Sequence, residues 1–436
     1  MRALSLVAIA AIPLQWFVLA TSGLGTLQVH EAALFLFSAA ILYVYGAHGL
    51  APITAKYRVF LLANLFMYFT WITVAVANGR PVVDPVQQLI YLVVMVAIAT
   101  FFYRAASSSR LVIASALRWA APLTLLSLLF AFYYSMSRNG VDGISVLRAG
   151  IESADPSVLE FGLYRKTFVG FGYDAETVRS NFRHEIFAGL LVSMLISSWA
   201  VTLVPFTTAL PRLIYRLSMV GATLAIILSL SRSITLAALV WPLLIGVRAV
   251  VTGRVRAREQ LMGISVVVGI FALSLTGVLA LLQQRVTAQT DSYTGRQTKL
   301  EIVLTRIEGA LFSGPGVNAE GDSPHNFVLD AWQEAGILVA IPAVVVAFFL
   351  LFLWLDLLRQ IGSLSAELVA VAAALTLPLV RLVTQGGGLM TIVEWTALAF
   401  VMGVLAGNSV RQVGTSTSVR RDRGVGEARR YPWDRA

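Results

Sequence analysis

Cysteine is absent from the 436 residues, and charged residues make up only 13% of the chain. The absence of cysteine excludes disulfides, thiolate metal sites and cysteine nucleophiles. A soluble domain usually carries about 25% charged residues. Here hydrophobic residues reach 58% instead, so the composition indicates an integral membrane protein.

Lysine is also scarce, with Lys56, Lys166 and Lys299 as its only occurrences, so nearly all of the positive charge is arginine. The formal net charge is +10. In a soluble protein this charge would suggest nucleic acid, but in a membrane protein its distribution matters more, and we expect no nucleic-acid partner. Two explanations stay open. One is a GC-rich genome, and the other is recognition of phosphate, which the planar guanidinium group suits.

Apolar runs of about 17 to 25 residues, long enough to cross a bilayer, recur along the whole chain. They predict an all-α integral membrane protein with about twelve transmembrane helices. The runs lie roughly at 4–20, 32–47, 59–77, 87–103, 111–134, 185–205, 213–230, 233–250, 261–282, 335–355, 366–383 and 391–408. The first run resembles a signal peptide, but no clear cleavage site follows it, so we expect it to be retained.

The arginines predict the orientation of the chain. If the N-terminus is cytoplasmic, every short segment on that side is basic, whereas the short connections on the other side hold only Arg80. Both termini are then cytoplasmic. We expect a transmembrane domain over 1–410 and a basic tail over 411–436, which is predicted to be disordered near anionic membrane lipids.

Two connections on the opposite side are long, at about 135–184 and 283–334. Connections of this length in a compact protein are usually functional or disordered. The second contains an apolar pattern at helical spacing after Gly295, which predicts a short amphipathic helix in the membrane interface, ended by the turn SGPG. Because both long loops lie on the non-cytoplasmic side, we expect the chemistry of the protein to occur at that face.

The second loop ends in GDSPHNFVLD, which contains His325. Ser323 is a suitable N-cap and Pro324 suits a first helical turn, so the pattern predicts a helix start with His325 in its first turn. The positive end of a helix disfavours the imidazolium and keeps the ring neutral, as a general base requires. The alternative is a histidine that only caps its own turn.

Arginines from distant segments are expected at the same membrane level as His325. Arg232 interrupts an apolar run, where a charge is costly and is usually paired or functional. The others are Arg183 at the end of the first loop, and Arg296 and Arg285 in the second. The alternative is contact with lipid headgroups.

The acidic residues of the outer loops lack the spacing of a metal site, and no cofactor motif is present, so we expect neither metal nor cofactor. A base among arginines suits the displacement of a diphosphate by a hydroxyl group. The hydroxyl needs a base, and the leaving group needs stabilisation of its charge.

Three segments, LSLSRSITLAAL, TGRQTKLEIVLTRIEGALFSGPGVN and SPHNFVLDAWQEAGILVAI, resemble in this order the O-antigen ligase and O-antigen polymerase superfamily. The resemblance covers 225–345. It implies a metal-independent, inverting glycosyltransferase of the bacterial inner membrane, with its active site facing the periplasm and an undecaprenyl-diphosphate-linked glycan as donor. By this resemblance His325 is the base, Arg232 and Arg296 hold the diphosphate, and Arg183 is a further contact.

The acceptor separates the remaining alternatives. An O-antigen ligase in lipopolysaccharide biosynthesis would use lipid A–core, and we expect this activity. An O-antigen or exopolysaccharide polymerase would instead extend a lipid-linked repeat unit. A membrane transporter is an alternative from another class, but it should place ionisable residues or broken helices near the midplane of several spans.

Overall fold

The computed structural model describes residues 2–14, 17–22, 25–107, 110–159, 162, 182–229, 231–253, 280, 283–284, 290–316, 326–384 and 390–427. Its elements are α1 (Arg2–Ala10), η1 (Ile12–Leu14), β1 (Val18–Ser22), β2 (Gly25–Gln28), α2 (Val29–Lys56), α3 (Arg58–Ala77), α4 (Val83–Ser107), α5 (Arg110–Leu117), α6 (Ala120–Arg138), α7 (Gly143–Ser153), α8 (Pro156–Leu159), α10 (Phe182–Leu203), α11 (Ala209–Leu228), α12 (Arg232–Thr252), α15 (Thr290–Gly309), α16 (Phe327–Ala335), α17 (Ile337–Arg359), α18 (Ala366–Thr384) and α19 (Ile392–Glu427).

Nine segments within these ranges are helical, long and apolar enough to cross a membrane. They belong to α2, α3, α4, α5–α6, α10, α11, α12, α17 and α19. The predicted all-α, multi-pass membrane architecture is therefore confirmed. The described residues do not contain all twelve predicted spans, because most of 261–282 lies outside them. The run 366–383 forms α18, an apolar helix of 19 residues in the middle of the bundle.

The first predicted span, 4–20, is not one continuous helix. Helix α1 contains nine residues and is followed by the 3₁₀ turn η1, which contains Pro13. Nine helical residues extend about 14 Å, less than half of the hydrocarbon core. Proline lacks the N–H needed to continue the helix. The chain then enters strand β1, which pairs antiparallel with β2.

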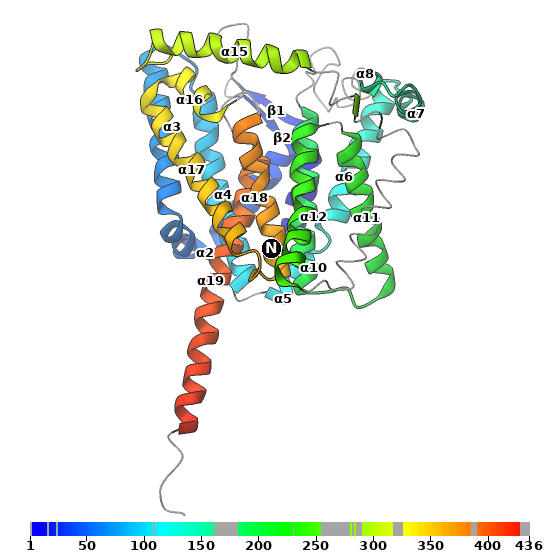
Figure 1. Ribbon diagram of the computed structural model, residues 1–436, viewed down its shortest axis with the longest axis vertical. Helices are drawn as coiled ribbons and strands as arrows, with labels where there is room; N and C mark the ends of the chain where they lie inside the picture. The colour runs from blue at the N-terminus through cyan, green and yellow to red at the C-terminus, as the bar shows by residue number, and fades with distance from the viewer. Residues whose placement is uncertain are drawn as a thin grey trace, which may run out of the picture.

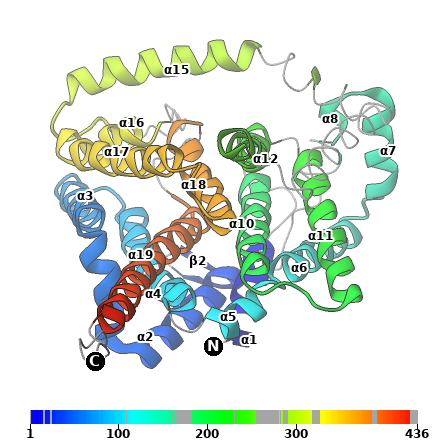
Figure 2. The ribbon, with the colours of Figure 1, turned by 60° about the horizontal axis from the view of Figure 1, so that its bottom comes forward.

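The centre of the bundle is formed by α4, α10, α18 and α19, which pack on one another (Figure 2). Helices α4 and α19 approach closely at Gly403, where an added Cβ would lie 2.3 Å from the Ala99 carbonyl oxygen. Gly407 follows one turn later, and such small residues allow two membrane helices to pack closely. The peripheral helices α11 and α12 instead expose Leu217 and Leu243, as expected for surfaces that face lipid.

Helix α15 lies across one end of the bundle, and we call this end the α15 end (Figure 1). Val303 and Ile307 on this helix are buried, whereas Leu304 is 42% exposed. The apolar pattern in the sequence is therefore only partly matched, because Leu304 belongs to that pattern and yet is exposed. The helix also begins at Thr290 rather than after Gly295. Helix α16 contacts α15 at the same end.

Helix α19 extends out of the bundle at the opposite end (Figure 1). The sequence predicts a disordered tail from 411, whereas the structure continues this helix to Glu427. Extension from a helix that is already formed avoids the cost of nucleation, and arginine has a high helix propensity.

Candidate functional site

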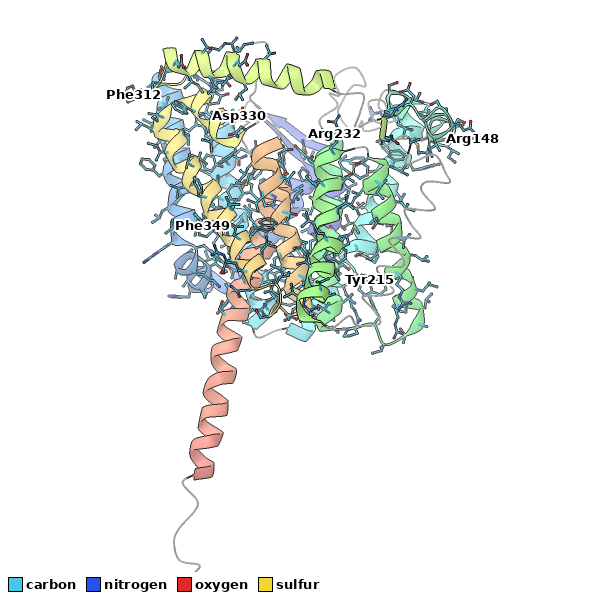
Figure 3. The ribbon with its side chains drawn as sticks, in the orientation of Figure 1. Arg148, Tyr215, Arg232, Phe312, Asp330 and Phe349 are labelled. Carbon is cyan, nitrogen blue, oxygen red and sulfur yellow. The ribbon has the colours of Figure 1, made fainter. Side chains whose placement is uncertain are left out.

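Arg232 is the first residue of α12, at the break between the seventh and eighth predicted spans. Ser231 caps this helix, because its hydroxyl oxygen accepts a hydrogen bond of 3.4 Å from the Ile234 N–H. Arg232 is half-buried and lies at the α15 end (Figure 3). The serine N-cap sets the first residue of α12, and this places Arg232 at the end of the helix.

The other predicted site residues are described only in part. Arg183 lies in the first turn of α10, and Arg296 lies within α15. For both, the structure gives the helical backbone and not the side chain. Arg285 and His325 lie outside the described residues. The structure thus gives the positions of three arginine-bearing segments, which begin α10 and α12 and form part of α15.

Helix α16 begins later than the sequence predicts. Its N-cap is Asn326, whose side-chain oxygen accepts hydrogen bonds of 3.0 and 3.2 Å from the N–H groups of Val328 and Leu329. The prediction that Ser323 is the N-cap of this helix is therefore wrong. His325 comes before the N-cap in the sequence, so it is not in the first turn of α16. Serine and asparagine are both good N-caps, so local sequence alone does not distinguish them.

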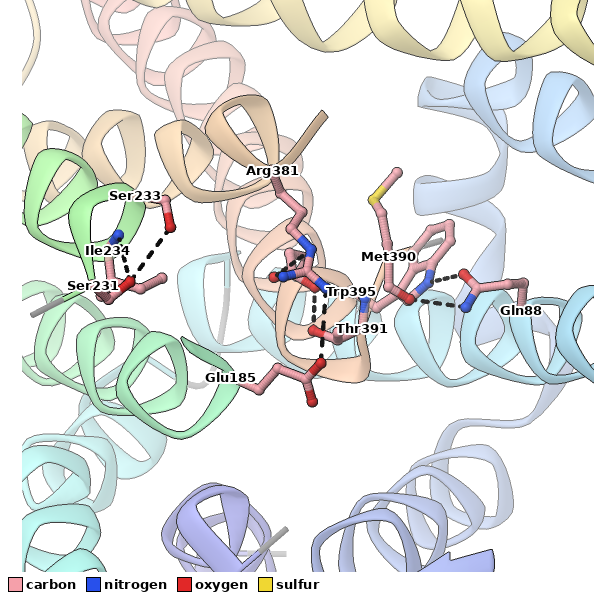
Figure 4. Close-up of polar contacts among 10 residues, drawn as sticks. Gln88, Glu185, Ser231, Ser233, Ile234, Arg381, Met390, Thr391 and Trp395 are labelled. Carbon is pink, nitrogen blue, oxygen red and sulfur yellow. Dashed lines mark hydrogen bonds and ion pairs between the residues drawn. The ribbon is translucent and has the colours of Figure 1, made fainter. Parts of the chain in front are cut away.

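An arginine that the sequence interpretation did not select, Arg381, joins three helices at the α15 end. Its guanidinium group lies 3.7 Å from the Glu185 carboxylate and 3.8 Å from the Glu394 carboxylate (Figure 4). The exposed fractions of these side chains are 11% for Arg381, 26% for Glu185 and 1% for Glu394. Arg381 interrupts an apolar run in PLVRLVT, which is the same signal that identified Arg232.

Two of the nearby carboxylates also cap their own helices. The Thr391 N–H donates a 2.6 Å hydrogen bond to one oxygen of Glu394, while the other oxygen faces Arg381. In the same way, the Gln28 N–H donates to one oxygen of Glu31 over 3.0 Å, and the Tyr91 hydroxyl donates to the other. Glu31 is the N3 residue of a capping box with Gln28, and Glu394 stands at the same spacing from Thr391, whose N–H it accepts.

Gln88 extends this polar layer across the centre of the bundle. Its side-chain oxygen accepts a hydrogen bond of 2.9 Å from the Trp395 indole N–H, and its amide nitrogen donates to the Met390 carbonyl oxygen over 2.9 Å (Figure 4). Gln88 is buried, and such a group is stable in an apolar bundle only when it is paired. These bonds therefore fix the start of α19 against α4.

Arg80, which follows α3, contacts three backbone carbonyl groups. Its guanidinium donates to the carbonyl oxygens of Ser313, Gly314 and Glu334 over 3.2, 2.9 and 2.6 Å, respectively. The first two acceptors follow α15, and the third lies near the end of α16. Arg80 thus connects the segments before and after 317–325.

The Glu334 side chain lies beside this contact. Its pKa is raised to about 7, mainly by burial and next by the Asp84 carboxylate. The Arg80 guanidinium opposes these effects, and the Asp330 carboxylate adds to them. Glu334 is therefore a titratable group near neutral pH at the α15 end.

Among the residues that the structure describes, histidine, aspartate and glutamate form no group of three or more that could hold a metal ion. A comparison of the chain with models of protein families and with curated proteins finds no match.

Proposed function

We propose that the protein is a glycosyltransferase that moves a glycan from an undecaprenyl-diphosphate carrier to an acceptor hydroxyl. The chemistry occurs at the α15 end, which faces the periplasm of a bacterial inner membrane. The main support is that segments far apart in the sequence reach this one end of the bundle (Figures 1 and 3). They carry Arg183, Arg232 and Arg296, and the segment of His325 leads directly into α16 at the same end.

In this reaction the acceptor oxygen forms a bond to the anomeric carbon, and the bond from this carbon to the diphosphate oxygen breaks. The electron pair of the broken bond remains on the diphosphate, while the hydroxyl proton passes to His325. Arginines stabilise the negative charge on the leaving group, with Arg232 and Arg296 as the main contacts and Arg183 and Arg285 as further ones. A single displacement of this kind inverts the configuration of the sugar.

The proposed acceptor is lipid A–core, which makes the protein an O-antigen ligase. A polymerase would use the same base and the same arginines, and it differs only in offering a site to a second lipid-linked glycan. The acceptor is therefore the variable that the experiment must change.

The test uses the purified protein in detergent with a lipid-diphosphate-linked glycan and a metal chelator. Lipid A–core and a second lipid-linked glycan are supplied in separate reactions. The expected result is transfer to lipid A–core with release of the lipid diphosphate. Transfer only to the second glycan would replace the ligase with a polymerase. No transfer to either, by protein with an intact thermal unfolding transition, would contradict the proposed function.

A further inference from the structure

Arg381 and Glu185 attract each other without forming a hydrogen bond. Their closest nitrogen and oxygen atoms are 3.7 Å apart, and the two side chains point toward each other in Figure 4. A direct N–H···O hydrogen bond is about 2.7 to 3.2 Å long, so this pair is too far apart for one. The same is true of Arg381 and Glu394, at 3.8 Å. The described part of the chain thus provides no hydrogen bond to the side chain of either Arg381 or Glu185.

The other carboxylates of this polar layer are already hydrogen-bonded. Glu394 accepts the Thr391 N–H and is 1% exposed, and Glu31 accepts the Gln28 N–H and the Tyr91 hydroxyl. These two groups hold the starts of their own helices. Their bonding differs from that of the pair formed by Arg381 and Glu185.

Arg381 and Glu185 also reach the surface of the bundle. The exposed fractions of their side chains are 11% and 26%, respectively. The guanidinium therefore keeps unused N–H donors, and the carboxylate keeps unused acceptor positions, beside each other at the α15 end.

A single oxygen atom of a ligand can complete this pair. An oxygen that lies about 2.8 Å from both the Arg381 nitrogen and the Glu185 oxygen bridges the distance between them. This oxygen must accept from the guanidinium and donate to the carboxylate, and a hydroxyl group does both. The oxygens of a diphosphate only accept, and the two nearby carboxylates repel their charge. The geometry therefore favours a hydroxyl group over a phosphate.

We propose that Glu185 and Arg381 bind a hydroxyl group of the donor glycan, which accepts a hydrogen bond from the Arg381 guanidinium and donates one to the Glu185 carboxylate. This inference rests on the proposed function. The donor glycan is the substrate that a ligase and a polymerase share, so it occupies the α15 end in either case. The pair holds the sugar in place and does not take the proton of the reaction.

The test compares the donor with a set of analogues that each lack one hydroxyl group of the transferred glycan. Loss of a hydrogen bond to a charged group is expected to lower kcat/KM about 10- to 100-fold. The wild type shows this loss with one analogue. Glu185→Ala shows it with the complete donor and loses nothing further with that analogue. The same further loss in both proteins, or no loss from Glu185→Ala, would overturn the sugar site.

Glu394→Gln is the matched control, because Glu394 faces the same guanidinium but is buried and bonded to Thr391. This variant is expected to keep the wild-type ratio of kcat/KM between the complete donor and the analogue, even where it lowers the unfolding temperature. A ratio that changes as much as in Glu185→Ala would reduce the role of Glu185 to packing.

A second variant, Glu185→Gln, keeps the size of the side chain and removes its charge. It is expected to lower kcat/KM less than Glu185→Ala does, because the amide oxygen still accepts a hydrogen bond but is uncharged. Thermal unfolding in detergent verifies that both variants are folded. Wild-type kcat/KM in folded Glu185→Gln and Glu185→Ala proteins would contradict the proposed contact.

Binding of the soluble glycan, cleaved from its lipid carrier, separates this inference from the proposed function. The glycan is expected to raise the unfolding temperature of the wild type and not that of Glu185→Ala. If the wild type transfers to neither acceptor but is stabilised in this way, the sugar site stands and the transferase fails. Transfer by Glu185→Ala at the wild-type rate would leave the transferase intact and overturn the sugar site.

Discussion

The Arg381 guanidinium of α18 lies 3.7 Å from the Glu185 carboxylate of α10, where both helices reach the α15 end (Figure 4). Arg183, a proposed diphosphate contact, is only two residues before Glu185 in the first turn of α10. The ion pair therefore fixes the start of the helix that carries Arg183 in its first turn. This links the packing of the bundle to the proposed binding of the donor.

Replacement of Arg381 by alanine is expected to destabilise the fold by about 3 kcal/mol, because it leaves the Glu394 carboxylate buried without its partner. Thermal unfolding in detergent measures the effect. The matched control is Arg148→Ala, since Arg148 pairs with Glu152 on the surface, where the side chains are 78% and 62% exposed. An exposed pair contributes at most about 1 kcal/mol. Equal destabilisation by both variants would contradict the structural role of Arg381.

Stability is expected to decrease as the pH rises from about 4.5 to 7 through the contribution of Glu334. The folded protein raises the pKa of this carboxyl from its ordinary value of 4.5 to about 7. Over this interval the folded state keeps a proton that the unfolded chain has released, so rising pH favours unfolding. Glu334→Gln should flatten this part of the curve of unfolding temperature against pH.

The control for the pH experiment is Glu301→Gln on the exposed side of α15. This change should leave the dependence as it is in the wild type. A Glu334→Gln variant with the full wild-type slope would show that other groups produce it.

Replacement of Arg232 by lysine is expected to lower kcat/KM for the donor about 10²-fold. Lysine keeps the charge but loses the fork of donors that can bind two phosphate oxygens together. Steady-state kinetics with the lipid-linked glycan measure this loss, and Arg212→Lys at the opposite end of the bundle should stay close to the wild type. Comparable activity in the two variants would remove Arg232 from the proposed donor site.

The sequence predicts those parts of this site that follow from the free-energy cost of placing one residue among its sequence neighbours. The charge of Arg232 in an apolar run is one example, and it correctly marks the start of α12. The same reasoning applies to Arg381, but this residue lies within the apolar run 366–383 that the sequence predicts as a span, which conceals the signal. The Thr391-x-x-Glu394 spacing is a further local signal, since it matches the Ser/Thr-x-x-Glu pattern of a helix start.

The sequence does not predict the partners that come from distant segments. The pairing of Glu394 with Arg381, and of Glu31 with Tyr91, depends on how the helices pack. The start of α16 is a similar case, because the choice between Ser323 and Asn326 as N-cap is not determined by local preference. In the sequence, Arg80 stands out only as an exception to the charge pattern, and its three carbonyl contacts become visible only in the fold.

The most direct test of the proposed glycosyltransferase measures transfer by His325→Ala against His48→Ala, with release of the lipid diphosphate as a second readout. His48 is an exposed histidine of α2 and serves as the matched control. Loss of a general base is expected to lower kcat about 10²- to 10⁴-fold, while His48→Ala keeps the wild-type rate. Undiminished transfer by His325→Ala, with its fold intact, would contradict the proposed mechanism.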